Sequence, residues 1–210
     1  MSTIITTSTE NFFKTAYKKL DLDDDRKKLL HKIAVTIANE INENKKVHLN
    51  FICTHNSRRS QIAQVWAFYA TTFFNLPISS FSGGTKITSF YRNAIKTLQK
   101  VGYTFNLVDF SHQNPKYSIS FEGSKKEIIV FSKRYDNPIN KEPFIAITTC
   151  NSADAKCPFI PAALDRFHLP YKDPKFSDGN SRSDEEYLKT NTEIAGEIYI
   201  IFNQVSLLVN

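Results

Sequence analysis

The segment from Cys53 to Ser60, with the sequence CTHNSRRS, restricts the possible folds of this chain more than any other feature. An apolar run from Val47 to Ile52 precedes it, and an apolar pattern with helical spacing begins near Gln61. We therefore expect the segment to join the end of a β-strand directly to the start of an α-helix. In such a junction the N–H groups of the loop and of the first helical turn point toward one place, where they attract an anion.

The side chains of this segment add chemistry to the anion site. The planar guanidinium of Arg59 can hold two oxygens of a tetrahedral oxyanion. Positive charge at the start of a helix favours the thiolate form of a cysteine, so Cys53 is a candidate nucleophile. We predict that Cys53 and Arg59 are catalytic. The residues predicted to bind the oxyanion are Thr54, His55, Asn56, Ser57, Arg58, Arg59 and Ser60.

Length and charge exclude several classes of protein. The chain has 210 residues, which favours one domain with an added element over two complete domains. No apolar run approaches the roughly 20 residues needed to cross a bilayer, and residues 1–14 lack the pattern of a signal peptide. We therefore expect a cytoplasmic protein with no membrane partner. The formal net charge of +6 does not indicate a nucleic-acid partner, because the lysines are interspersed with acidic residues.

Apolar patterns divide most of the chain into alternating helices and strands. Residues 1–45 contain two helical patterns, which we expect to form an N-terminal helical extension. Short apolar strands are predicted at 47–52, 76–81, 144–149 and 166–169, and helices at 61–75 and 93–101. Ser183 to Glu186 has the pattern of a capping box and is expected to begin a long final helix. This alternation indicates an α/β fold with a small parallel sheet and helices on both faces.

The middle of the chain, from Tyr103 to Pro143, departs from this alternation. Residues 118–121 and 127–131 alternate polar and apolar side chains on either side of Gly123, which predicts a β-hairpin. We expect this hairpin to belong to an insertion at about 113–135. The predicted organisation is an N-terminal extension at 1–45 followed by one catalytic domain at 46–210.

The segment from Cys53 to Ser60, with its strand and helix, resembles the phosphate-binding loop of the low-molecular-weight protein tyrosine phosphatase superfamily. The pair Asp173-Pro174 follows the last predicted strand, at the place where that family carries its general acid. The resemblance covers about residues 46–208 without the insertion. It implies a four-stranded parallel sheet of order 2-1-3-4 and a catalytic role for Asp173, which would protonate the leaving group.

The other two cysteines indicate a branch of that superfamily. Thr149 to Pro158, which contains Cys150 and Cys157, resembles the redox segment of thioredoxin-coupled arsenate reductases. This resemblance implies that Cys53 attacks arsenate and that Cys150 then forms a disulfide with Cys53. Cys157 would next attack Cys150, which gives a Cys150–Cys157 disulfide and frees Cys53. It implies that Cys150 and Cys157 are catalytic, that thioredoxin is a partner, and that no cofactor is tightly bound.

Some residues depart from the pattern of the family. His55 stands where relatives often have glycine, which restricts the backbone of the loop. Arg58 stands where many relatives have a cysteine or a small residue, and it adds positive charge near Cys53. Lys175 follows Asp173-Pro174, where tyrosine phosphatases tend to have an aromatic residue. The histidines show no metal-ligand spacing, so we predict no metal site.

Three functions are open at this point. The first is an arsenate reductase that acts on arsenate with a thioredoxin-type reductant. The second is a low-molecular-weight protein tyrosine phosphatase that hydrolyses phosphotyrosine through a cysteinyl-phosphate. The third is a non-catalytic module that binds phosphate or sulfate. The presence of Cys53, Arg59 and Asp173 disfavours the third function, and the pair of Cys150 and Cys157 favours the first.

Overall fold

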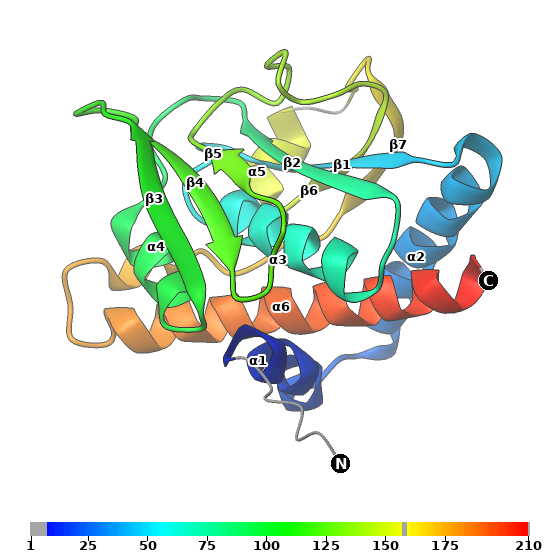
Figure 1. The fold of residues 1–210 in the computed structure, drawn as a ribbon, viewed down its shortest axis with the longest axis horizontal. Coiled ribbons are helices and arrows are strands. Elements are labelled where there is room, and N and C mark those ends of the chain that lie inside the picture. Colours follow the sequence, from blue (N-terminus) through cyan, green and yellow to red (C-terminus); the bar gives the residue numbers. More distant parts are fainter. Residues whose placement is uncertain (1–7, 157–158, 210) are drawn as a thin grey trace.

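A four-stranded parallel sheet lies at the centre of the computed structural model, which describes residues 8–156 and 159–209 (Figure 1). Its strands are β1 (Val47–Cys53), β2 (Ile78–Gly84), β6 (Phe144–Thr148) and β7 (Ala163–His168). A second, antiparallel sheet consists of β3 (Tyr103–Asp109), β4 (Lys116–Phe121) and β5 (Ile128–Val130). The helices are α1 (Ser8–Ala16), α2 (Asp24–Asn44), α3 (Arg59–Phe73), α4 (Arg92–Gln99), α5 (Asn151–Lys156) and α6 (Ser183–Leu208), with 3-10 turns η1 (Tyr17–Lys19) and η2 (Pro174–Ser177).

The central sheet has the strand order β2-β1-β6-β7, which confirms the predicted order 2-1-3-4. Strand β1 therefore has a neighbour on both sides, and its last residues pair with Gly84 of β2 and Thr148 of β6. Because all four strands run parallel, their carboxyl ends lie at the same edge of the sheet. Ligands of open parallel sheets bind at that edge.

The two faces of the central sheet have different cores. Val47, Leu49 and Phe51 belong to the main core, which also contains the buried residues of α2, α3 and α6. Ile52 belongs to a smaller cluster on the other face, which includes Ala153 of α5. The alternation follows from the period of two residues in a β-strand. The prediction of helices on both faces is confirmed.

The N-terminal helices pack into the main core. Phe13 of α1 is fully buried and stacks on Trp66 of α3, with ring centroids 5.5 Å apart. Helix α2 contributes Ile33 and Ile37 to the same core, against which α6 also packs. Trp66 is therefore a core residue. The division of the chain at residue 45 stays a prediction, although both parts share one core.

The second sheet contains the predicted hairpin and one strand that the sequence did not predict. Strands β4 and β5 pair antiparallel on either side of Gly123, which confirms the hairpin. Strand β3 pairs with β4, but five of its seven residues, Thr104 and Asn106 to Asp109, are solvent-exposed. Its residues Tyr103 to Leu107 do alternate apolar and polar side chains, but Tyr103 is its only buried residue.

The predicted capping box at the start of α6 is wrong. Ser183 is the first helical residue, and Arg182 occupies the cap position without a side-chain bond to the helix. The Ser183 hydroxyl instead accepts a hydrogen bond of 2.9 Å from Asn93 of α4. A tertiary contact has thus replaced the local one.

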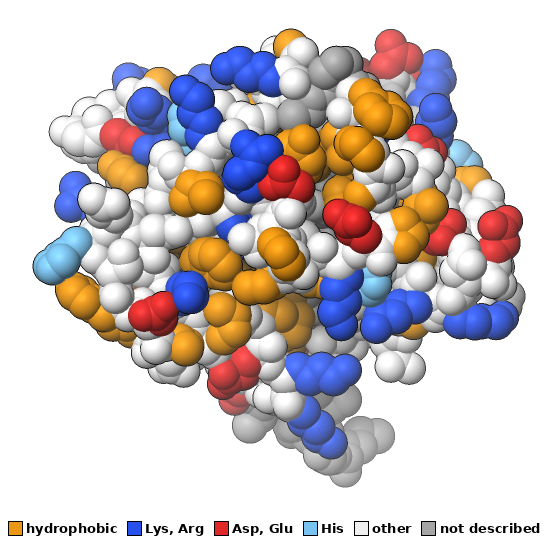
Figure 2. Space-filling view, turned by 90° about the horizontal axis from the view of Figure 1, so that it is seen from above, with side chains coloured by type: hydrophobic (Ala, Val, Ile, Leu, Met, Phe, Trp, Pro, Cys, Tyr) orange, Lys and Arg blue, Asp and Glu red, His pale blue; other side chains and the backbone are white. Residues whose placement is uncertain are grey.

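Two features of the structure concern the membrane and nucleic-acid partners that were not expected from the sequence. None of the helices in the described part of the chain is long and apolar enough to cross a membrane. Figure 2 shows lysine and arginine side chains interspersed with acidic and apolar ones on the face that it presents.

Candidate active site

The oxyanion loop, residues 54–58, joins β1 directly to α3, as predicted. Cys53 is the last residue of β1, and Arg59 is the first residue of α3. Gly84 of β2 pairs with Cys53 and lies against the loop. A Cβ on Gly84 would stand 2.9 Å from the Asn56 nitrogen and 2.6 Å from the Lys86 oxygen, so only glycine fits there. The loop is therefore enclosed on the β2 side by backbone.

The Cys53 sulfur has two polar neighbours from the same segment. The Asn56 N–H donates a hydrogen bond of 3.1 Å to the sulfur, and the Ser60 hydroxyl lies 3.0 Å from it. The side chain of Cys53 is almost fully buried. Hydrogen-bond donors around a buried sulfur stabilise the negative charge of a thiolate.

Asn56 holds the shape of the loop. Its backbone has a φ of 47°, and its side chain is fully buried. Its side-chain NH₂ group donates a bond of 2.9 Å to the Ser60 hydroxyl. Its side-chain oxygen accepts bonds from the Gln61 side chain (3.2 Å) and from the Lys133 N–H (2.9 Å). Asparagine tolerates the left-handed region better than most residues. Because Asn56 adopts this conformation and His55 does not, the restriction expected at His55 causes no strain.

Arg59 binds the segment that carries the predicted acid. One terminal nitrogen of its guanidinium donates a bond of 2.6 Å to the Asp173 carboxylate, and the other donates a bond of 2.8 Å to the Tyr171 carbonyl. The other carboxylate oxygen of Asp173 accepts a bond of 3.0 Å from the Lys175 N–H and so caps η2. Asp173 remains 38% exposed, which leaves it accessible to a substrate.

A small hollow lies above Cys53 and contains most of the predicted site. Its lining residues are Cys53, Thr54, His55, Ser57, Arg58, Arg59 and Asp173. The structure therefore brings Asp173 together with the oxyanion loop, although more than a hundred residues separate them in the chain. Asn56 and Ser60 do not line the hollow. Their side chains support the loop from inside the protein instead.

Arg58 lines the hollow but is bound to residues outside the loop. Its guanidinium donates bonds of 2.6 Å to the Tyr187 hydroxyl and 2.6 Å to the Asp178 carboxylate. It also lies 4.0 Å from the centre of the Tyr91 ring. Burial alone would lower the pKa of Arg58, but the bond to Tyr187 and the charge of Asp178 outweigh it and raise this pKa. Asp178, Tyr187 and Tyr91 were not predicted from the sequence, because no local motif marks them.

Two further basic side chains near the loop have shifted pKa values. Partial burial, with the positive charges of Lys175 and Lys86, lowers the pKa of His55 below its ordinary value. Burial lowers the pKa of Lys133 to about 8. The Lys133 ammonium has no hydrogen-bond partner among the residues that the structure describes and lies 5.1 Å from the centre of the Phe131 ring.

Cys150 lies beside the oxyanion loop at the same edge of the sheet. It follows β6, is buried, and belongs to the same small cluster as Cys53. Its sulfur is 3.5 Å from the hydroxyl of Thr54, the first residue of the loop. Cys157 lies outside the described residues.

The residues that follow Cys150 form the short helix α5, whereas their polar sequence suggests a flexible spacer. Asp154 holds α5 against the sheet: its carboxylate accepts a bond of 2.7 Å from Thr148 and forms an ion pair with Arg166. His168 also lies 3.4 Å from this carboxylate. No local motif marks this set of contacts, since the partners come from three different elements.

The sheet order, with a Cys-x5-Arg loop at the end of β1 and an Asp-Pro turn after β7, defines the low-molecular-weight protein tyrosine phosphatase superfamily. Solved structures support the fold. A low-molecular-weight protein tyrosine phosphatase from Bacillus subtilis matches with a TM-score of 0.50 and 13% identity, over 76% of this chain and 97% of that chain. A YwlE mutant from the same organism matches with a TM-score of 0.51 and 14% identity, over 76% and 99% of the two chains.

Curated relatives identify the branch, although no protein-family model matches the chain. The arsenate reductase of Brevibacillus brevis is 30% identical over 133 residues, which cover 63% of this chain and 79% of that protein. The arsenate reductase of Bacillus subtilis is 29% identical over 137 residues, or 65% and 79% of the two chains. The protein belongs to the arsenate reductase family of enzymes.

Proposed function

We propose that this protein reduces arsenate to arsenite by a relay of three cysteines. The observation that carries the proposal is the place of Cys150, which is buried at the edge of β6 with its sulfur 3.5 Å from Thr54 of the oxyanion loop. The family relationship to proteins named arsenate reductase supports the same substrate. A tyrosine phosphatase has no need of a second thiol at this position.

The first step is the attack of Cys53 on arsenate. The Cys53 thiolate forms a bond to arsenic(V), and one oxygen leaves as water after protonation. Arg59 and the N–H groups of the loop hold the remaining oxygens. Asp173 lies next to Arg59 and is the group that can supply the proton to the leaving oxygen. Arsenic keeps its oxidation state in this step.

The second and third steps transfer electrons between sulfur and arsenic. The Cys150 thiolate attacks the Cys53 sulfur, a disulfide forms between them, and the electron pair of the broken sulfur–arsenic bond reduces arsenic(V) to arsenite. The Cys157 thiolate then attacks the Cys150 sulfur and releases Cys53 as a thiolate. A thioredoxin-type dithiol finally reduces the disulfide between Cys150 and Cys157.

A second candidate is the hydrolysis of an aryl phosphate, and the place of Asp173 in the lining of the hollow above Cys53 favours it. A general acid matters most when the leaving group is a poor one, such as the phenol of a phosphotyrosine. In this reaction Cys53 would carry the phosphoryl group, and water would release it. Cys150 and Cys157 would then have no part in turnover.

The test compares both reactions in the same preparation. Arsenate turnover with thioredoxin and its reductase is measured beside the hydrolysis of 4-nitrophenyl phosphate. For the relay, Cys157→Ser should stop after one turnover with a Cys53–Cys150 disulfide, visible by peptide mass mapping, and Cys150→Ser should form no such bond. Phosphatase activity without arsenate turnover would refute the relay and leave the second candidate. Oxyanion binding without either reaction would refute both.

A further inference from the structure

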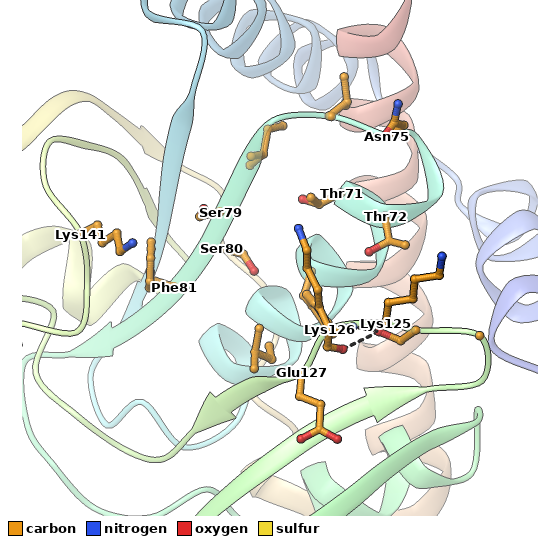
Figure 3. A pocket seen from close by; sticks show the side chains of 16 residues that line it. Thr71, Thr72, Asn75, Ser79, Ser80, Phe81, Lys125, Lys126, Glu127 and Lys141 are labelled. Atoms are coloured by element: carbon orange, nitrogen blue, oxygen red, sulfur yellow. Dashed lines mark hydrogen bonds between the residues drawn. The ribbon is translucent and has the colours of Figure 1, made fainter.

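A large cavity lies at the end of α3 that is remote from Cys53 (Figure 3). Its volume is about 620 Å³. Four parts of the chain form its walls: the last two turns of α3, the segment from Asn75 to Phe81 with the first half of β2, residues 123–128 at the turn between β4 and β5, and Lys141 before β6. A cavity of this size is typical of sites for small molecules. None of the residues that line the hollow above Cys53 lines this cavity.

The cavity combines an apolar floor with a positive rim. Phe68, Leu76 and Ile78 are buried and give it apolar surface. Hydroxyl groups line the wall beside them, and Figure 3 shows the Lys126 side chain extending toward Thr71 and Ser80 on this wall.

The positive charge at the rim is not compensated. Lys125, Lys126 and Lys141 form no ion pair within the part of the chain that the structure describes, and each is exposed. The only lining carboxylate is that of Glu127, which accepts a hydrogen bond from Ser118. Figure 3 shows the Glu127 carboxylate directed away from the lysines. Three cations against one engaged carboxylate give the cavity a positive potential, which attracts anions.

We propose that this cavity is a second ligand site, for an anion with an aromatic or branched aliphatic body. The apolar body would contact Phe68 and Ile78, and the negative group would lie between Lys126 and Lys141. The hydroxyl groups of the wall would orient the ligand. The proposal is independent of the reaction at Cys53.

The test uses 8-anilinonaphthalene-1-sulfonate, an aromatic anion whose fluorescence rises in apolar surroundings. The folded wild-type protein should bind it saturably at one site. Lys126→Ala combined with Lys141→Ala should weaken binding about 10-fold, since each exposed ion pair contributes up to about a factor of 5. Lys189→Ala, which removes an exposed lysine from α6, should leave binding unchanged. Circular dichroism confirms that each variant is folded.

Two competitors locate the probe. The uncharged analogue N-phenyl-1-naphthylamine should bind at least about 10-fold more weakly, and phosphate that saturates the oxyanion loop should not displace the probe. Non-saturable binding, equal binding of the uncharged analogue, or no effect of the double lysine variant would overturn the proposal. Displacement by phosphate would place the probe in the loop and would overturn it too.

An independent observation concerns the segment that carries Asp173. The 3-10 turn η2 lies between Asp173 and Asp178. The adjacent arginines Arg59 and Arg58 bind these two residues, respectively. Arg58 binds Asp178 and Tyr187, and the Tyr187 hydroxyl donates a bond of 2.7 Å to Asp178, which closes a ring of three side chains. The Arg58 side chain is only 12% exposed. Low exposure reduces screening by solvent, so this contact is stronger than a surface ion pair.

We infer that Arg58 is a positioning residue that holds the acid segment in place through Asp178 and Tyr187. This inference rests on the proposed chemistry at Cys53, because its purpose is to keep Asp173 above the loop. A cysteine or small residue at position 58 could not reach Asp178. The contact with Asp178 therefore depends on Arg58, a position at which this chain departs from the pattern of its family. Without Arg58, the contact of Arg59 with Asp173 would hold only the N-terminal end of η2.

The first measurement does not need turnover. Hydrogen exchange of the Lys175 to Asp178 amides should become at least about 10-fold faster in Arg58→Ala, because the segment opens more often. Arg166→Ala, which removes another ion-paired arginine, should leave these amides unchanged. Unchanged exchange in Arg58→Ala would overturn the inference whether or not the protein is active.

The second measurement separates positioning of the acid from a general loss of structure. Arg58→Ala should slow the hydrolysis of phenyl phosphate about 10-fold or more but that of 2,4-dinitrophenyl phosphate less than about 3-fold, since the second leaving group needs no proton. Arg58→Lys should restore part of the loss. An equal loss for both esters would overturn the inference. A wild-type protein that hydrolyses neither ester would refute the second candidate function, while the exchange result still decides on the contact.

Discussion

The two cysteines that the structure describes lie at the carboxyl ends of neighbouring strands, but their surroundings are built differently. On the side of Cys53, the fully buried Asn56 bonds to Ser60, Gln61 and the backbone of Lys133. On the side of Cys150, the helix α5 has six residues, and the partly exposed carboxylate of Asp154 holds it against the sheet.

This difference matches the tasks proposed for the two sides. An oxyanion site must keep its donors in place throughout the reaction, because their value depends on preorganisation. A relay requires the second cysteine to move between two partners, and a segment with few buried contacts opens at low cost. A fixed and a movable thiol can therefore lie at one sheet edge when the contacts that follow each strand differ.

The largest expected effect concerns the acid segment. Asp173→Asn should slow the hydrolysis of phenyl phosphate by about 10²- to 10⁴-fold, the usual contribution of a positioned acid. The effect should shrink for 2,4-dinitrophenyl phosphate, and the binding of phosphate should change little. An equal loss with both esters would show instead that Asp173 supports the fixed side only through its contact with Arg59.

Removal of the Asn56 side chain should destabilise the loop that follows Cys53. Asn56→Ala should lower the free energy of unfolding by about 2–4 kcal/mol, because buried partners lose their bonds and alanine disfavours a φ of 47°. Asn75→Ala is the matched control: its φ is 52°, but its side chain is exposed. It should cost about 1 kcal/mol. Urea unfolding measures both values, and equal losses would mean that the buried contacts of Asn56 contribute nothing.

Lys133 offers a test by pH. Burial lowers its pKa from 10.5 to about 8, so the unfolded chain binds more protons between these two values. The free energy of unfolding of the wild type should therefore rise with pH over this range relative to that of Lys133→Met. At pH 7 the variant should be more stable by about 3 kcal/mol, from the size of the shift. Parallel pH profiles for the two proteins would show that Lys133 is not desolvated.

The smallest effect on stability is expected in α5, the helix that follows Cys150 and is proposed to move. Asp154→Ala should cost about 1 kcal/mol in unfolding free energy, since the carboxylate is partly exposed. It should nevertheless speed the alkylation of Cys150 by iodoacetamide several-fold, as quantified by peptide mass mapping. Asp184→Ala, which breaks an exposed contact with Lys96 and Lys100, is the control. If Asp154→Ala leaves Cys150 as unreactive as before, α5 is not the movable element.

The local sequence was sufficient for the parts of the site that lie within one junction. A strand, a Cys-x5-Arg loop and a helix occupy adjacent residues, so their geometry follows from backbone hydrogen bonding and helix polarity alone. The hairpin around Gly123 was predictable for the same reason. The resemblance to a known family supplied the strand order and the expected role of Asp173, which no local pattern contains.

Only the tertiary structure determined which distant side chains support the site. The contacts of Arg58 with Asp178 and Tyr187 span more than a hundred residues, and Lys133 reaches Asn56 from a segment with no motif. The same reason explains the failed capping box, because Ser183 bonds to Asn93 rather than to its own helix. The sequence alone determined the strand–loop–helix junction at Cys53, since its form depends on local backbone geometry. Packing determined how firmly each cysteine is held, because burial and hydrogen bonding between distant segments exist only once the chain has folded.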